Sequence, residues 1–267
     1  MVDPSNILHV DQTGKGVLRL TMDDQPTRNA LSEDMMKSLI GEITKASSSD
    51  SVRVIVVAAN GPVFSAGHDL KEITRVRNQN DSGEEYFDRL FDTCSSLMKL
   101  IVSCSKPVIA EVSGIATAAG CQLVASCDLA TASDSAQFAT PGVNIGLFCS
   151  TPMVALSRNV SKKHAMEMLL TGDMIDAIKA KEIGLINSYF QIEELTKETM
   201  VLANKIASKS SMTISMGKKA FYSQSDLDLS SAYDYTSQVM VENLLKGDAK
   251  EGIGAFIEKR PAKWTDK

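Results

Sequence analysis

The sequence contains few of the residues from which metal sites and disulfide scaffolds are built. Only 3 of its 267 residues are histidine, and its 5 cysteines include no pair with the Cys-x2-Cys spacing of a zinc site. An odd number of cysteines in a chain of this length also argues against a disulfide framework, so we expect reduced thiols. We therefore predict no metal centre and no resident cofactor.

Long apolar runs and an excess of positive charge are also missing. The longest apolar run, Val54–Ala59, is far too short to cross a bilayer, and the first residues show neither the basic start nor the apolar segment of a signal peptide. A formal net charge of -5 argues against a protein that coats nucleic acid. We expect no membrane span, no nucleic-acid partner and a cytoplasmic location, or the mitochondrial matrix if a eukaryotic transit peptide has been removed.

The pattern of apolar residues predicts alternating strands and helices, followed by a helical last third. Period-two or continuous β-branched runs predict strands over residues 16–22, 52–58, 108–112 and 128–132. Spacings of three and four predict helices after Ser32 and over residues 84–104, 163–170, 195–207, 229–245 and 249–258. This is the pattern of an α/β protein. Glu111 lies in the third strand, and we assign it no role.

Two segments rich in glycine and alanine each follow a predicted strand and precede a helix. They are Phe64–Glu72 and Gly114–Leu123. Small residues let a ligand approach the backbone closely, and a helix N-terminus leaves N–H groups unpaired. Two such termini facing each other would place two donors on one oxygen, which is the arrangement of an oxyanion hole. Tight turns between packed elements would give the same pattern.

The two segments resemble the signatures of the crotonase (enoyl-CoA hydratase/isomerase) superfamily. Ser65–Glu72 resembles the first signature, and Ile109–Leu129 resembles the second. Further matches lie at Arg28–Leu31, Leu170–Gly172, Gly184–Leu185 and Phe256–Arg260. His68 and the run Thr117–Gln122 look most like the enoyl-CoA hydratase domain-containing protein 3 subgroup. The resemblance covers almost the whole chain in the right order.

The resemblance implies a crotonase-like (ClpP/crotonase) α/β fold, which is a spiral of ββα units. On this basis we assign residues 1–195 to the spiral core. Residues 196–267 then form a C-terminal helical region that builds trimers, or pairs trimers into hexamers. The resemblance also implies an acyl-CoA ligand, so that coenzyme A enters as part of a small-molecule substrate.

By family position, the thioester oxygen would lie between the backbone N–H groups of His68 and Ala119. Because the donors are backbone groups, histidine can stand at position 68, where the family usually has alanine. The family positions that bind substrate or CoA fall on Arg28, Ala30, Ala66, His68, Asp69, Leu70, Lys71 and Lys259. Arg260 and Lys263 are candidates for binding the CoA phosphates by charge alone.

The sequence departs from the family pattern at the two glutamates with which hydratases activate water. Those positions fall on Gln122, whose amide does not titrate, and on Gly142, which has no side chain. The carboxylate of dienoyl-CoA isomerases would fall near Ser150. Each positioned acid or base contributes about 100–10,000-fold. We therefore expect weak or absent hydratase activity, and some recovery on restoring both glutamates.

Five side chains remain as candidates near the predicted pocket. They are His68, Gln122, Asn144, Cys149 and Ser150. A histidine in Ser-Ala-Gly-His-Asp also resembles methylmalonyl-CoA decarboxylases of the superfamily, and loss of CO2 generates an enolate without a base. Decarboxylation or other enolate chemistry at His68 is thus one alternative, and a non-catalytic acyl-CoA-binding oligomer is another. Cys149 is more simply a buried thiol than a nucleophile.

Overall fold

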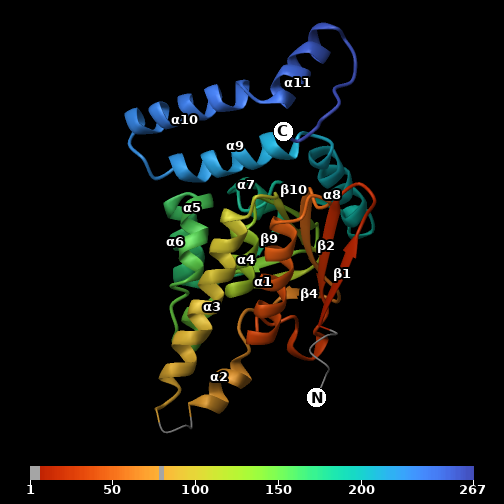
Figure 1. Cartoon of the computed structure of the whole chain (residues 1–267). Coiled ribbons are helices and arrows are strands. Elements are labelled where there is room, and N and C mark those ends of the chain that lie inside the picture. Colours follow the sequence, from red (N-terminus) through yellow and green to blue (C-terminus); the bar gives the residue numbers. More distant parts are fainter. Residues whose placement is uncertain (1–6, 78–80) are drawn as a thin grey trace.

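Two β-sheets form the centre of the molecule (Figure 1). The structure is a computed structural model that describes residues 7–77 and 81–267, so residues 1–6, in which no leader was expected, lie outside it. The first sheet has the order β1-β2-β3-β5-β7-β10, with β1 antiparallel to β2 and the other neighbours parallel. Its strands are β1 Leu8–Gln12, β2 Val17–Met22, β3 Val54–Ala59, β5 Val108–Val112, β7 Leu129–Ser133 and β10 Ser188–Phe190.

The second sheet is smaller and has the order β4-β6-β8-β9. Its strands are β4 Val63–Ser65, β6 Ile115–Thr117, β8 Gln137–Ala139 and β9 Ile175–Asp176. The chain repeatedly adds one strand to the first sheet, one to the second, and then a helix. Those helices are α2 Leu70–Val76 after β4, α4 Ala119–Ser126 after β6, and the short 3-10 helix η3 Pro141–Ile145 after β8. The repeated order confirms the predicted spiral of ββα units.

Both faces of the first sheet are covered around β3. Ile55 and Val57 join the large core that includes the apolar faces of α1 (Glu33–Ser47) and α3 (Glu84–Ser103). Val54 and Val56 point the other way and pack with Ala203 of α8 (Ile192–Ala207). Alternate residues of one strand therefore enter two different apolar clusters.

The predicted start of α1 is confirmed by its cap. The Ser32 side chain accepts a hydrogen bond from the Met35 N–H at 3.2 Å, and Glu33 and Asp34 occupy the first turn. The prediction for α3 is also confirmed to within a residue at its end. Helix α4 begins at Ala119, inside the second glycine- and alanine-rich segment.

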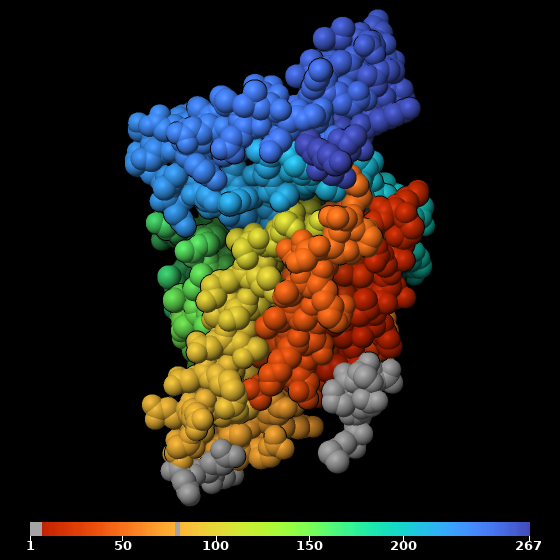
Figure 2. Space-filling model, viewed as in Figure 1, coloured from red at the N-terminus to blue at the C-terminus, as the bar shows by residue number. Residues whose placement is uncertain are grey.

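The C-terminal helices form a layer at one end of the molecule, opposite α2 (Figures 1 and 2). They are α9 Ser211–Gln224, which the sequence did not predict, α10 Leu229–Leu244 and α11 Gly247–Ile257. The predicted boundary at residue 195 falls inside α8, which packs on the first sheet. The remaining helices are α5 Pro152–Asn159, α6 Lys162–Thr171 and α7 Ala177–Glu182. Within the described ranges, no helix has the length and apolar character needed to span a membrane.

A buried ion pair ties α9 to the core. Lys218 of α9 donates from Nζ to the carbonyl oxygens of Ile101 and Lys106, at 2.8 and 3.0 Å, and to Asp128 Oδ2 at 2.7 Å. The hydroxyl of Tyr222 donates to the second oxygen of Asp128 at 2.9 Å. Since the Lys218 side chain is only 7% exposed, these partners replace its hydration.

Candidate active site

The two glycine- and alanine-rich turns lie side by side because the strands before them are neighbours. Strands β4 and β6 pair in parallel, with Ser65 beside Ala116, so both end at the same edge of the second sheet. A Cβ atom built on Gly67 would lie 2.9 Å from the Ala118 Cβ and 3.2 Å from the Ala119 nitrogen. The turns are thus in contact, as the oxyanion-hole prediction requires.

Both turns leave a backbone N–H group free at this contact. Ala119 is the first residue of α4, and no described side chain caps that helix. Among residues 7–77 and 81–267, neither the His68 N–H nor the Ala119 N–H donates to a backbone carbonyl oxygen outside the regular helices and strands. Gly67 has a φ of +85°, which glycine adopts without strain. Two unpaired donors therefore flank the point where the turns meet.

Ala118 holds this geometry in a strained conformation. Its φ of 50° and ψ of -118° lie outside the regions that residues with a Cβ atom favour. Its N–H donates to the Ala139 carbonyl at 3.0 Å, and its carbonyl accepts from Gln122 at 3.0 Å, so both hydrogen bonds hold the peptide in place. Strain at this position is therefore maintained by the surrounding structure.

We expect Ala118→Gly to stabilise the protein by about 1 kcal/mol. Glycine removes strain of about 1–3 kcal/mol but loses about 0.5–1 kcal/mol more chain entropy on folding. Urea unfolding of both proteins measures the difference. The matched control is Ala119→Gly, which lies in regular helix and is expected to destabilise the protein. Equal effects of the two substitutions would show that position 118 is not strained.

His68 is held in one orientation by the backbone of a third segment. Its Nδ1 lies 3.0 Å from the Leu31 carbonyl oxygen, and the Leu31 N–H donates to the Gly67 carbonyl at 2.8 Å. The ring also meets the Phe91 ring edge-on, with centroids 5.5 Å apart. Burial lowers the pKa of His68, opposed by the hydrogen bond to Leu31. The imidazole is therefore neutral near pH 7.

Gln122 lies in α4, just after the second glycine- and alanine-rich turn, and its side chain faces α3. It is buried, and Cys94 donates from its thiol to the amide oxygen at 3.8 Å. Burial raises the pKa of Cys94 to about 12, so this thiol stays protonated.

The sequence did not predict three residues of the site, because they lie in segments with the pattern of ordinary core. They are Leu31, Phe91 and Cys94. The spacing of Phe91 and Cys94, three residues apart on one helix face, was the available signal.

The position that would carry the second glutamate is tightly enclosed. A Cβ atom at Gly142 would lie 2.9 Å from the Cys149 sulfur and 2.8 Å from the Leu147 carbonyl oxygen. Burial raises the pKa of Cys149 and so favours the neutral thiol. This agrees with the prediction of a buried, unreactive cysteine. Asn144 and Ser150 are exposed, and the Ser150 hydroxyl donates to a neighbouring carbonyl.

Comparison with known proteins identifies the family. The profile of Enoyl-CoA hydratase/isomerase matches residues 12–267. The chain is 50% identical over 250 residues to enoyl-CoA hydratase domain-containing protein 3, mitochondrial, of Rattus norvegicus, covering 94% of this chain and 82% of the relative. The chain belongs to the enoyl-CoA hydratase/isomerase family.

Solved structures agree with this family assignment. The crystal structure of human enoyl coenzyme A hydratase domain-containing protein 3 gives a TM-score of 0.92 at 48% identity, covering 97% of this chain and 100% of the other. An enoyl-CoA hydratase from Mycobacterium smegmatis gives 0.92 at 45% identity, covering 97% and 98%. These comparisons confirm the crotonase fold and the resemblance to the domain-containing protein 3 subgroup.

The cations predicted to bind the CoA phosphates are dispersed over the molecule. Arg28 and Lys71 are exposed, and the Arg28 carbonyl accepts from the Ala66 N–H at 3.1 Å. Lys259 follows α11, at the end of the molecule opposite α2 (Figure 1). The other predicted contacts lie nearer the turns, with Ala30 buried, Ala66 and Asp69 half-buried, and Leu70 exposed. Asp69 caps α2 by accepting from the Lys71 N–H at 2.8 Å.

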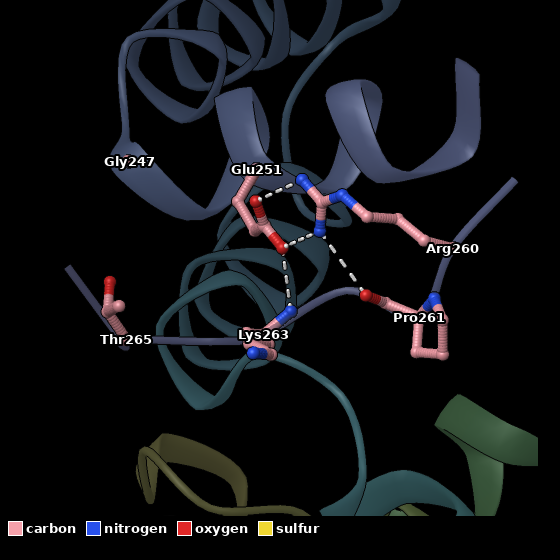
Figure 3. Close-up of a pocket in the computed structure, with 6 residues that line it drawn as sticks. All are labelled: Gly247, Glu251, Arg260, Pro261, Lys263 and Thr265. Carbon is pink, nitrogen blue, oxygen red and sulfur yellow. Dashed lines mark hydrogen bonds and ion pairs between the residues drawn. The ribbon is translucent and has the colours of Figure 1, made fainter. Parts of the chain in front are cut away.

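Arg260, a candidate by charge alone, is already paired. Its guanidinium group donates to both oxygens of Glu251, at 2.7 and 2.9 Å (Figure 3). It also donates to Glu258 at 2.6 Å. The hydrogen bonds from Arg260, together with the Lys263 backbone N–H, lower the pKa of Glu251 to about 2. Binding a phosphate at Arg260 would therefore require breaking this arrangement. The exposed Lys263 donates its backbone N–H, at 2.8 Å, to the same Glu251.

Proposed function

We propose that this protein binds an acyl-CoA thioester and stabilises its enolate between the backbone N–H groups of His68 and Ala119. The contact between the two turns carries the proposal, because it brings the backbone beside Gly67 to the first N–H of α4. Negative charge develops on the thioester oxygen only as the enolate forms, so fixed donors favour that state over the ground state. Losing one such donor typically costs about 3 kcal/mol.

We propose that the protein activates the thioester but does not efficiently activate water. The family positions of the two hydratase glutamates fall on Gln122 and Gly142, and neither residue can exchange a proton with water. The enclosure of Gly142 by Cys149 supports this proposal, since the structure leaves no room there for a longer side chain. Enolate chemistry without a strong base is therefore better supported than hydration.

We further propose that Arg28 and Lys71 bind the CoA phosphates and that Lys259 reaches them from another copy of the chain. Arg28 and Lys71 belong to the segments around the first turn, whereas Lys259 follows α11, the helix that lies at the far end of the same protomer (Figure 1). A trimer or hexamer built through residues 196–267 would bring Lys259 of one copy towards residues 1–195 of the next. Lysines bind phosphate as point charges, so several can share this role.

Thermal unfolding with a thioester and its thioether tests the proposal. We expect butyryl-CoA at 100 times its Kd to add about 2.7 kcal/mol, which is a rise in Tm of roughly 5–10 °C. The matched ligand is S-butyl-CoA, which keeps the CoA but lacks the carbonyl oxygen, and it should raise Tm less. No shift with millimolar butyryl-CoA would contradict acyl-CoA binding, and equal shifts would contradict the oxyanion hole.

A further inference from the structure

Residues 28–31 hold the first turn of the site from one side. The Leu31 N–H donates to the Gly67 carbonyl at 2.8 Å, and the Leu31 carbonyl oxygen lies 3.0 Å from Nδ1 of His68. The Ala66 N–H donates to another carbonyl group of the same segment, at 3.1 Å. Each of these three turn residues is therefore hydrogen-bonded to one short segment that lies far from it in the sequence.

The hydrogen bond to Gly67 sets the direction of the first proposed donor. The Gly67 carbonyl and the His68 N–H belong to one planar peptide group, which is trans, so the two point in opposite directions. Because Leu31 holds the carbonyl, the N–H of His68 points away from residues 28–31. A shift of this segment would turn the whole peptide group and move the donor with it.

Asn29 fixes the position of the segment. It is fully buried, and its side-chain oxygen accepts from the Asp24 N–H at 2.7 Å. Its amide nitrogen donates to two carbonyl oxygens, that of Asn60 at 2.9 Å and that of Val63 at 2.7 Å. Val63 is the first residue of β4, the strand that leads into the turn. Since both amide hydrogens are used inside the protein, Asn29 acts through the backbone that it holds.

The backbone is strained at the point where Asn29 holds it. Arg28 and Asn29 are consecutive residues with positive φ, 59° and 52°. Residues with a side chain rarely adopt this region, although asparagine does so more readily than most. Such conformations persist only where the surrounding structure enforces them, and they cluster at functional sites. The hydrogen bonds of the Asn29 side chain supply that restraint.

We propose that Asn29 is a positioning residue that fixes the His68 N–H against the thioester oxygen by holding residues 28–31 in place. This inference rests on the proposed function and goes beyond it, because it names a fully buried residue on which the first donor depends. Arg28, a proposed ligand of the CoA phosphates, belongs to the same segment. One element therefore carries both the phosphate contact and the support of the donor.

Paired ligands separate positioning from stability. Calorimetry of butyryl-CoA and S-butyl-CoA gives the ratio of their two Kd values, and only the thioester has a carbonyl oxygen that can report on the donors. We expect the wild type to bind the thioester about tenfold more tightly, which corresponds to about one hydrogen bond. In Asn29→Gly, which keeps the positive φ without strain, the ratio should fall to about two or below.

The matched control is an asparagine at the surface of the same region. Asn60 is exposed, and its side chain donates to Asp23 at 2.9 Å. Asn60→Ala removes this contact and keeps the Asn60 carbonyl group with which Asn29 pairs. The ratio of the two Kd values should therefore stay at the wild-type value.

Infrared spectroscopy measures the same hydrogen bond independently of affinity. The ligand is butyryl-CoA labelled with 13C at its carbonyl carbon, because a hydrogen bond to the carbonyl oxygen lowers the stretching frequency. At saturating ligand we expect a smaller shift in Asn29→Gly than in the wild type, and an unchanged shift in Asn60→Ala. A merely structural role of Asn29 would lower stability and leave this frequency at the wild-type value.

A milder variant decides the case if Asn29→Gly does not fold. The Thr27 hydroxyl accepts from the Ala30 N–H at 3.2 Å, so Thr27→Val, which has nearly the same shape, loosens the same segment. We expect the ratio of the two Kd values to fall about twofold. A folded Thr27→Val protein with the wild-type ratio and carbonyl frequency would contradict the proposal.

The outcomes distinguish the inference from the function on which it rests. If the wild type binds neither ligand, or binds both equally, the proposed function fails. If the wild type prefers the thioester and Asn29→Gly keeps the full preference, the oxyanion hole stands and positioning by Asn29 is overturned. An equal loss of preference in Asn60→Ala would overturn it as well.

Discussion

Crotonyl-CoA hydration by this protein is expected to run at least about 10,000-fold below the rate of a site with both carboxylates. One positioned acid or base contributes about 100–10,000-fold, and here both family positions lack a titratable group. The proposed oxyanion hole would by itself still polarise the thioester, so we expect a small rate above that in solution. Loss of the enoyl absorbance measures it. A wild-type rate close to that of an efficient hydratase would show that another group activates water.

Restoring the carboxylates is the matching control, and the structure changes how it must be done. Gln122→Glu replaces a side chain of nearly equal size and should recover up to about 100-fold. The pair with Gly142→Glu, expected from the sequence to help, does not fit the structure as it stands, because Cys149 and Leu147 occupy the space. Adding Cys149→Ala removes one obstruction, and the exposed loop around Leu147 must move to remove the other. We expect the triple variant to exceed the double variant in rate.

Gly120→Ala is expected to destabilise the protein by about 3 kcal/mol or more and to abolish the response to acyl-CoA. A Cβ atom there would overlap the Ser65 backbone oxygen and lie 2.8 Å from the Ser65 Cβ. Ser65 is fully buried in β4, so it has no space into which to retreat. Overpacking of this kind costs about 1–3 kcal/mol when side chains can adjust, and more when backbone is involved. The substitution also pushes α4, and with it Ala119, away from the first turn.

Gly41→Ala separates this clash from the general effect of replacing a glycine. Gly41 also lies in a helix, α1, and no described atom lies within 4 Å of a Cβ built there. It should stabilise the protein by about 0.5–1 kcal/mol, because alanine favours helix. Denaturant unfolding and butyryl-CoA thermal shifts of both variants are the measurements. A Gly120→Ala protein as stable as the wild type would show that α4 does not need its close approach to β4.

The sequence predicted the parts of the fold that depend on local pattern. The strand from residue 52, the cap at Ser32 and the long helix from Glu84 follow from spacing and residue type, which act within a few residues. The meeting of the two turns was also predictable, since each follows a strand and precedes a helix. Helix α9 was missed because its apolar face is weak, and Ala220 is the only buried apolar residue among those described in this helix.

The polar contacts of the site and core could not be predicted, because they join residues far apart in the chain. Glu111, to which the sequence gave no role, accepts hydrogen bonds from both terminal nitrogens of Arg19, at 2.6 and 2.7 Å, and from the Thr196 hydroxyl at 2.8 Å. His68 depends in the same way on Leu31. Which distant group completes a polar cluster is decided by the sheet order, and a single sequence does not contain that information in any local pattern.

The position of Lys218 limits how the C-terminal helices can move. Detaching α9 would leave the ammonium group and Asp128 without the partners that now surround them, and unpairing a buried charge costs several kcal/mol. Helix α9 therefore unfolds together with the ends of α3 and α4 as one cooperative unit, rather than swinging away at residue 196. Any hinge that opens or closes this end of the molecule has to lie beyond Gln224, where α9 ends.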